Sequence, residues 1–194
     1  EMCIRDRFVF SADSLEINGA AATGGVIGAA KSGTEEAVIL KNLNLAARSM
    51  KVDSKNYAGG LIGTASGNGS VTFETVNLSL NTLEINGKHA AGGAVGQVSA
   101  GSMLLNEINI LTTKAAGDSG EAGQDAAGDE DQYGIRVTAE NGIAGGLIGS
   151  AASRVTELTI RNAAVSGSGT ADQIESGSSA GGLIGDTRAA STKI

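Results

Sequence analysis

Proline and tryptophan are absent from this chain of 194 residues, and aromatic residues make up only 3% of it. Large globular cores usually depend on aromatic bulk, so we expect a narrow interior built from leucine, isoleucine, valine and alanine. No apolar run approaches the roughly 18 residues that a membrane-spanning helix requires. The sequence therefore predicts no membrane insertion in this segment. Glycine, by contrast, is abundant: it accounts for 30 of the 194 residues, about 15%, whereas its average share in proteins is about 7%.

The chain also lacks a cluster of basic residues, and its formal net charge is −7. A protein that binds nucleic acid needs a basic face to meet the phosphates, so we predict no nucleic-acid partner. The negative charge is concentrated in one short stretch without any base, and the remainder of the chain is close to neutral. The acidic residues of this stretch are Asp118, Glu121, Asp125, Asp129, Glu130 and Asp131.

The first residues differ in character from all that follow. Residues 1–6 resemble the translation of an adapter used in preparing sequencing libraries, so we assign residues 1–7 to an adapter-derived artefact and leave them out of the fold prediction. The single cysteine, Cys3, lies in this segment, so the natural segment is expected to contain none. A lack of cysteine fits a cytosolic protein and a surface protein without disulfides equally well. We expect residues 8–194 to be one fragment that is cut at both ends.

One short segment recurs five times along the chain. Each copy has the pattern Ala/Thr-Gly-Gly-x-Ile/Val-Gly, and the copies occupy residues 23–28, 58–63, 91–96, 144–149 and 180–185. The first glycines of successive copies are separated by 35, 33, 53 and 36 residues. Because the one long interval contains the acidic stretch, the basic unit is a repeat of about 34 residues, a length found in stacked repeat proteins.

Each repeat also holds two apolar-polar-apolar triplets, whose alternation is a strand signal. The first type is found at 43–45, 78–80, 108–110 and 158–160, and the second type at 15–17, 50–52, 83–85 and 135–137. In the fourth interval the second type weakens to 163–165. Turn-forming Gly, Asn, Ser and Asp residues lie between the triplets, so one coil is expected to contain three short strands and three corners.

Strands this short cannot bury a face alone, but coils stacked on one another form a continuous core. We therefore predict an all-β parallel β-helix (β-solenoid) of about five coils of ~34 residues, with three short strands per coil. We expect it to be right-handed, following the chirality of parallel crossovers. A β-sandwich domain would need about 100 residues, and a helical solenoid would not tolerate glycine pairs and β-branched triplets in every unit.

The pattern also predicts which side chains face inward. The position of Ile62 is β-branched in all five copies, so we expect it to point into the coil and to contact Ile27 and Val95 in neighbouring coils. Gly60 and Ala58 would then face inward too, which would make one wall thin and allow the backbones of two walls to approach closely.

The middle residues of the triplets are expected to face solvent and to stack from coil to coil. In the second type they alternate in charge, which stabilises neighbouring strands by about 0.2–1 kcal/mol per pair; they are Glu16, Lys51, Glu84 and Arg136. In the first type they would form an uncharged polar ladder of Asn44, Ser79, Asn109 and Thr159.

No convincing catalytic, cofactor-binding or metal-binding constellation is visible, and we predict none. The glycine segment lacks the G-x-G-x-x-G spacing and the downstream acid of a dinucleotide loop. His89, the only histidine, is expected in a turn without partners. The acidic segment 112–133 is expected to leave the coil at one corner as a flexible, solvated loop. A calcium-binding loop is the alternative, since Asp125 and residues 129–131 offer oxygen ligands, although their spacing matches no EF-hand.

The Gly-Leu-Ile-Gly cores at 60–63, 146–149 and 182–185, with variants at 25–28 and 93–96, resemble the GLUG motif. This motif is found in large bacterial surface proteins, including adhesin-like proteins and the repeat region of some immunoglobulin-A-cleaving peptidases. The resemblance covers most of the chain after residue 13. It supplies no catalytic residues that could be transferred to this sequence.

The resemblance implies a structural or adhesive repeat module of a secreted or cell-wall-attached bacterial surface protein, non-catalytic and extracellular. Its partners would be host or bacterial glycans or proteins, met through the loops, and neighbouring repeats of the same chain. Two alternatives stay open. One is the β-helix region of a carbohydrate-active enzyme, and the other is a repeat region within a secreted peptidase.

Overall fold

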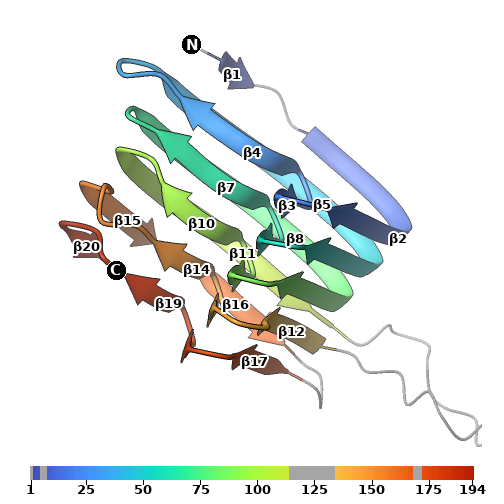
Figure 1. Ribbon diagram of the computed structural model, residues 1–194. Helices are drawn as coiled ribbons and strands as arrows, with labels where there is room; N and C mark the ends of the chain where they lie inside the picture. The colour runs from blue at the N-terminus through green and yellow to red at the C-terminus, as the bar shows by residue number, and fades with distance from the viewer. Residues whose placement is uncertain (1, 5–7, 114–133, 168–171) are drawn as a thin grey trace, which may run out of the picture.

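A computed structural model describes residues 2–4, 8–113, 134–167 and 172–194. Over these residues the chain forms twenty β-strands and no helix, and each strand pairs with its neighbours in parallel. The strands stack in about five coils, one above another, as Figure 1 shows. The predicted β-solenoid is therefore confirmed, whereas its handedness stays a prediction. Among the described residues there is accordingly no helix of the length and apolarity needed to cross a membrane.

The largest of three sheets, here called the long sheet, has ten strands. Its members are β1 (Met2–Ile4), β2 (Phe8–Gly19), β5 (Ala37–Ser54), β8 (Ser70–Gly87), β11 (Ser102–Thr112), β12 (Gly134–Ala139), β15 (Glu157–Arg161), β16 (Ala164–Gly167), β17 (Gln173–Ser176) and β20 (Thr192–Lys193). The two other sheets are narrow and have five strands each. One consists of β3 (Ala22–Gly24), β6 (Tyr57–Gly59), β9 (Ala90–Gly92), β13 (Ile143–Gly145) and β18 (Ser179–Gly181). The other consists of β4 (Ile27–Ser32), β7 (Ile62–Gly67), β10 (Val95–Ser99), β14 (Ile148–Ala151) and β19 (Ile184–Thr187).

Three sheets match three strands per coil, but the strands divide the repeat differently from the prediction. Both triplets of a repeat lie on one long strand, and the glycine segment is shared by two short strands. The long strand bends twice. The first bend lies at Asn42, whose φ is 56°, and the register carries the same bend to Thr75, Glu107 and Asn162, all with positive φ. The second bend lies at Arg48, which is skipped in the pairing of β5 with β8.

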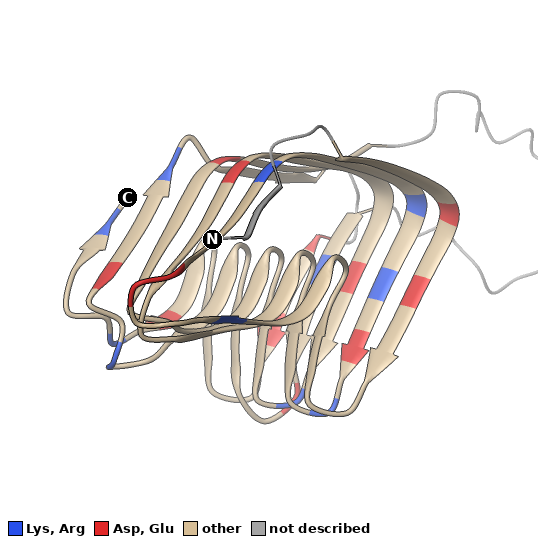
Figure 2. Ribbon diagram, turned by 90° about the horizontal axis from the view of Figure 1, so that it is seen from above, with Lys and Arg blue, Asp and Glu red and all other residues tan. Residues whose placement is uncertain are grey.

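The glycine segment makes a sharp bend between the two narrow sheets, and in Figure 2 these bends form a row inside the outline of the coils. A Cβ at Gly59 would lie 2.1 Å from the Ile62 carbonyl oxygen, far closer than a van der Waals contact, and a Cβ at Gly63 would meet the Ala22 and Thr23 backbone of the preceding coil. The two arms of the bend thus touch backbone to backbone. The prediction assigned the close approach to Gly60, but a Cβ at Gly60 would meet the Gly93 carbonyl of the next coil. Gly59 and Gly63 are the glycines that permit the two arms to approach.

Each bend is hydrogen-bonded to the bend of the next coil. The amides of Leu61 and Ile62 both donate to the Ala94 carbonyl, at 2.9 and 3.0 Å, and the same pattern joins the other copies. Ile62 pairs with Ile27 on one side and Val95 on the other, and is fully buried. Leu61 is fully buried as well, so simple alternation fails at the bend because the chain turns there instead of continuing as a strand.

The core is a column of aliphatic side chains inside the coils, as the composition predicts. Its largest fully buried members are Phe73, Leu43, Met50, Leu61, Ile62, Leu78, Leu80, Leu83, Ile85, Met103, Leu105 and Ile108. Phenylalanine occurs there once, at Phe73. In the last coil the corresponding positions are more open, with Ile184 half-buried and Leu183 37% exposed.

The acidic segment leaves the stack where the sequence predicts. Thr112 pairs with Leu80 and Gly134 pairs with Thr82, so the whole segment replaces a single residue, Asn81, of the preceding coil. This position is the second bend of the long strand. Residues 114–133, and with them the predicted flexible loop and its calcium-binding alternative, lie outside the described residues.

The register corrects the grouping of the first triplets. Asn44 pairs with Asn77 rather than Ser79, and Thr159 pairs with Leu104 rather than Asn109. The segment 163–165, taken as a weak second triplet, belongs to the first type, because Ala164 pairs with Asn109. The second triplet of the last coil is centred on Gln173, which pairs with Arg136.

Candidate functional site

A row of alternating charges crosses the outer face of the long sheet. Glu16 pairs with Lys51, Lys51 with Glu84, and Glu84 with Arg136, as the sequence predicts. Figure 2 shows this charge row as alternating red and blue bands on neighbouring strands. The Lys51 Nζ atom lies 3.7 Å from Glu84 Oε2 and 3.8 Å from Asp53 Oδ2. The row runs across four coils, and the Lys51–Glu84 ion pair joins two of them.

A second row, the asparagine ladder, takes the place of the uncharged ladder that the sequence analysis proposed. It consists of Asn44, Asn77 and Asn109 in three successive coils. The Nδ2 atom of Asn77 donates to Asn44 Oδ1 at 3.0 Å, and that of Asn109 donates to Asn77 Oδ1, also at 3.0 Å. Stacked amides of this kind satisfy one another along the stacking direction.

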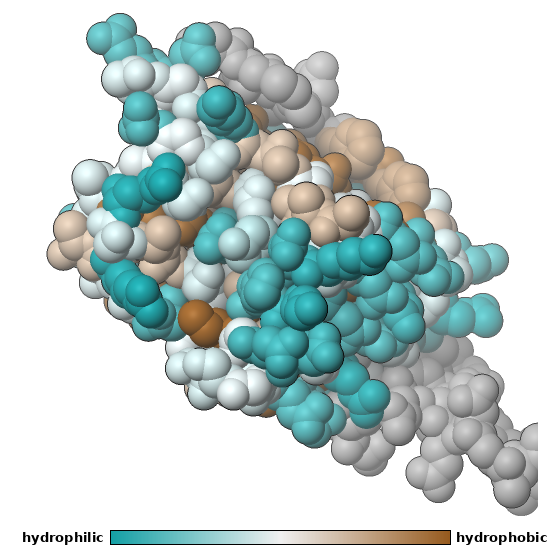
Figure 3. All heavy atoms as spheres, viewed as in Figure 1, coloured by the Kyte–Doolittle hydropathy of each residue, from teal (hydrophilic) through white to brown (hydrophobic). Residues whose placement is uncertain are grey.

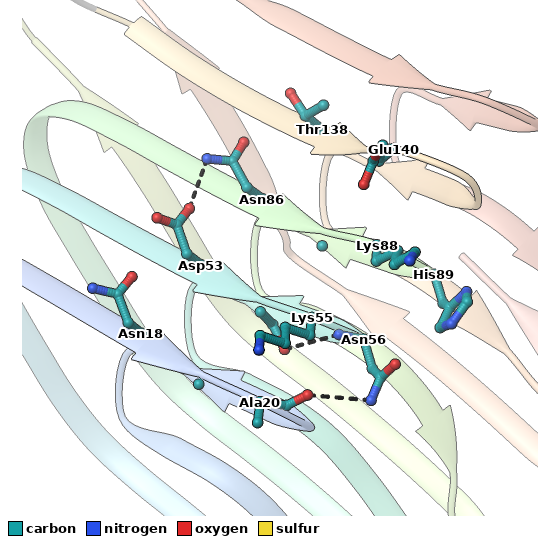
Figure 4. Close-up of a pocket in the computed structure, with 13 residues that line it drawn as sticks. Asn18, Ala20, Asp53, Lys55, Asn56, Asn86, Lys88, His89, Thr138 and Glu140 are labelled. Carbon is teal, nitrogen blue, oxygen red and sulfur yellow. Dashed lines mark hydrogen bonds between the residues drawn. The ribbon is translucent and has the colours of Figure 1, made fainter.

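An open groove of about 950 Å³ lies where the long strands end and the narrow sheet of β3 and β6 begins. We call it the corner groove. Figure 3 shows hydrophilic side chains gathered over this part of the surface, and Figure 4 shows the residues that line the groove. It crosses four coils, because each coil contributes the last residues of its long strand and the turn that follows.

One side of the groove, the strand wall, is a row of polar side chains at equivalent positions. They are Asn18, Asp53, Asn86 and Thr138, each paired with the next in the register of the long sheet. The opposite side, the turn wall, is formed by the residues that directly follow each long strand: Ala20, Lys55, Lys88 and Glu140. Figure 4 shows the two walls facing each other across the strand ends.

Small residues form the floor between the walls. Gly19, Ser54 and Gly87 occupy one register position in three successive coils. A Cβ at Gly87 would come within 2.3 Å of the Ala90 carbonyl oxygen, so a side chain there would displace the backbone of β9. The groove is therefore hollow because small residues occupy its base, and at Gly87 the turn folds back so closely that only glycine fits.

The strand wall is held in place by its own hydrogen bonds. Asn86 Nδ2 donates to Asp53 Oδ1 at 2.8 Å and to Glu84 Oε1 at 2.9 Å. Asn18 Nδ2 donates to Glu16 Oε1 at 3.2 Å. These bonds link the wall to the charge row and fix the outward carbonyl oxygens of the amides, so the wall presents acceptors in preset positions.

The turn wall carries the free cations of the groove. Lys55 and Lys88 lie at equivalent positions in successive coils, are exposed, and form no ion pair with any residue of the described ranges. His89 lies beside Lys88, and its ring packs against Tyr57 with the centroids 6.3 Å apart. Hydrogen bonds join the turns of neighbouring coils: Asn56 Nδ2 donates to the Ala20 carbonyl at 3.3 Å, and the His89 amide donates to the Asn56 carbonyl at 2.8 Å.

Among the described residues, the one side chain with a clearly shifted pKa is Glu157, which does not line the corner groove. Lys193 Nζ is 2.6 Å from Glu157 Oε1, and this hydrogen-bonded ion pair lowers the pKa of the Glu157 carboxyl. The pair joins β20 to β15 and helps to hold the end of the described chain on the stack. This ion pair therefore contributes to the packing of the last coil and has no part in the corner groove.

No catalytic, cofactor or metal residue was predicted from the sequence, and neither was the corner groove. Within residues 2–4, 8–113, 134–167 and 172–194 there is no group of three His, Cys, Asp or Glu side chains placed to hold a metal ion. His89 lies in a turn, as expected. The signal that could have revealed the groove is the spacing of Asn18, Asp53 and Asn86, which matches the spacing of the glycine segments.

Comparison with known proteins adds no family to this picture. No protein-family model, no curated protein and no solved structure matches the chain. The function is therefore inferred from the stacked coils, the corner groove and the sequence motif.

Proposed function

We propose that this chain is a structural and adhesive repeat module of a secreted or cell-wall-attached bacterial surface protein. Its role would be to extend as a rigid stack and to present contact surfaces, without catalysing a reaction. The resemblance to the GLUG motif points in this direction, and the repeated coil gives it a physical basis.

The observation that carries the proposal is that equivalent polar residues of successive coils line one continuous groove. A binding surface built this way grows with the number of coils, as in other solenoids whose repeated surfaces bind extended partners. The charge row, the asparagine ladder and the hydrogen-bonded bends hold that surface in a single register. A stiff stack with a repeated groove suits attachment.

Cell-surface location is the part of the proposal that can be tested most simply. Antibodies raised against residues 8–194 should label intact cells of the bacterium that encodes the chain, and a brief protease treatment of those cells should remove the signal. Labelling that requires lysis of the cells would contradict a surface role, whatever the groove binds.

A second candidate, a carbohydrate-cleaving β-helix, is favoured by one observation: Asp53 and Glu140 line the same groove. We rank it second because Asp53 already accepts a hydrogen bond from Asn86 and lies near Lys51, and because Asn86 and its coil separate it from Glu140. New reducing ends released from a polysaccharide by the wild-type protein, and not by Asp53→Asn, would reverse this ranking.

A further inference from the structure

We propose that the corner groove binds a linear glycan that carries carboxylate groups, that is, a uronate-containing polysaccharide lying along the solenoid axis. The inference rests on the proposed adhesive function and deepens it by naming the class of ligand. Three features of the groove support it: the extended shape, the two chemically different walls, and the paired backbone of the strands that cross it.

The shape of the groove calls for an extended ligand. It passes across four coils, and with neighbouring strands about 4.8 Å apart its length is about 14 Å. The groove is open rather than enclosed, and both walls repeat once per coil. A chain molecule with a short repeating unit can meet the same side chains at each step, whereas a compact ligand would use only part of the groove.

The chemistry of the walls suits a sugar chain. Sugar hydroxyls both donate and accept hydrogen bonds. The strand wall offers amide, carboxylate and hydroxyl oxygens from Asn86, Asp53 and Thr138, and the turn wall offers ammonium donors. Because Asn86 and Asn18 are already held by bonds to the charge row, little side-chain freedom is lost when a ligand binds.

An extended peptide fits the groove less well. Peptides commonly bind by adding a strand to an unpaired sheet edge or by placing apolar side chains in pockets. Here β5, β8 and β12 are paired on both sides, and among the described residues only β2, at one end of the groove, has an open edge. The lining residues also include no leucine, isoleucine or valine that could form an apolar pocket.

The lysines give the preference for acidic sugars. Lys55 and Lys88 are one coil apart on the same wall and have no anionic partner among the described residues. On the opposite wall Asp53 is engaged by Asn86 and lies near Lys51, which offsets its charge. Glu140 also lies on the turn wall, one coil beyond Lys88. A uronate chain can therefore place its carboxylates beside Lys55 and Lys88, away from Glu140, and its hydroxyls toward the strand wall.

The test uses oligosaccharides of three acidic kinds, galacturonate, alginate and hyaluronan, with the protein of residues 8–194 in isothermal titration calorimetry. Fully methyl-esterified oligogalacturonate is the matched probe, because it keeps the sugar backbone and loses the charge. We expect at least one acidic oligosaccharide to bind, roughly tenfold more tightly than its uncharged counterpart, and to weaken as salt is raised. Binding of none of the three, or equal binding of the ester, would overturn the proposal.

A double variant, Lys55→Gln with Lys88→Gln, ties binding to the groove. It should weaken binding of the acidic oligosaccharide roughly tenfold, as expected for the loss of two exposed ion pairs. The matched control, Lys31→Gln with Arg154→Gln, removes the same charge from exposed positions outside the groove and should leave affinity unchanged. Unchanged circular dichroism and thermal unfolding would show that both variants keep the fold.

Three outcomes separate this proposal from the broader one. Equal loss of binding in the two double variants would show a general charge effect and contradict a groove site. Tighter binding of a glutamate hexapeptide than of every oligosaccharide would show a peptide site instead. If no oligosaccharide binds while antibodies still label intact cells, the ligand proposal fails and the surface role stands.

Discussion

At the scale of single residues, glycines that occupy similar positions in the repeat have different structural roles. Gly59 and Gly63 allow the two arms of the bend to meet, while Gly60 and Gly93 allow one coil to lie directly on the next. A Cβ at Gly93 would come within 2.1 Å of the Gly146 carbonyl oxygen. The glycine segment thus lets the backbone turn sharply and lets the backbones of neighbouring coils pack in close contact.

This account predicts opposite results at two equivalent glycines. Gly93→Ala should lower the free energy of unfolding by about 2 kcal/mol, because the added methyl group forces neighbouring coils apart. Gly182→Ala should have almost no effect, because no atom lies within 4 Å of the position that its Cβ would take. Urea unfolding followed by circular dichroism measures both changes. Equal midpoints for the two variants would contradict the stacking role.

The asparagine ladder makes a second prediction at this scale. Asn77 donates to Asn44 and accepts from Asn109, so Asn77→Ala removes two side-chain hydrogen bonds and should cost about 1–3 kcal/mol. Ser79→Ala is the control, since Ser79 is an exposed outward residue two positions along the same strand. Thermal unfolding compares the variants, and a midpoint for Asn77→Ala no lower than that of the control would count against the ladder.

At the scale of the strands, the alternating charges determine how neighbouring coils align. A strand that shifts by two residues against its neighbour keeps its aliphatic side chains facing the core. The same shift would break the opposite-charge contacts of the charge row, so these contacts favour the observed alignment. The ion pair between Lys51 and Glu84 and the bond from Asn86 to Glu84 make Glu84 the central member of this row.

Glu84→Lys should therefore destabilise the fold by about 0.5–1 kcal/mol at low salt, because it places like charges beside Lys51 and Arg136. The loss should shrink as sodium chloride is added, since these side chains are partly exposed and their interaction is screened. Glu35→Lys, an equal charge change at an exposed turn, provides the control. No loss, or a loss that does not change with salt, would contradict a stabilising role for the alternating charges.

The same scale shows what the sequence could predict. The glycine segments and the second triplets align by simple spacing, so the stacking of Ile62 with Ile27 and Val95 and the order of the charge row follow from the sequence. The first triplets did not align correctly, because residues 76 to 80 alternate without a break and a shift by two keeps the pattern. The groove was missed because its residues share a wall only after the turns fold back.

At the scale of the whole molecule, the described chain is one stack whose coils depend on their neighbours for burial. Interior coils bury Ile62, Val95 and Ile148 completely, while the equivalent Ile184 of the last coil is only half-buried. Stability in such a stack is the sum of coil and interface contributions. All the surface features discussed above, including the corner groove, exist only while neighbouring coils stay in register.

Cross-linking between coils tests that stacking most directly. Thr64 and Gln97 are outward-facing partners in adjacent coils, and Ser150 is the partner of Gln97 one coil further on. With Cys3 replaced by serine, Thr64→Cys combined with Gln97→Cys should form a disulfide on mild oxidation, because paired Cα atoms lie within disulfide range. Thr64→Cys combined with Ser150→Cys should not form one, since a whole coil lies between them. Equal cross-linking of both pairs, or cross-linking of neither, would contradict the stacked solenoid.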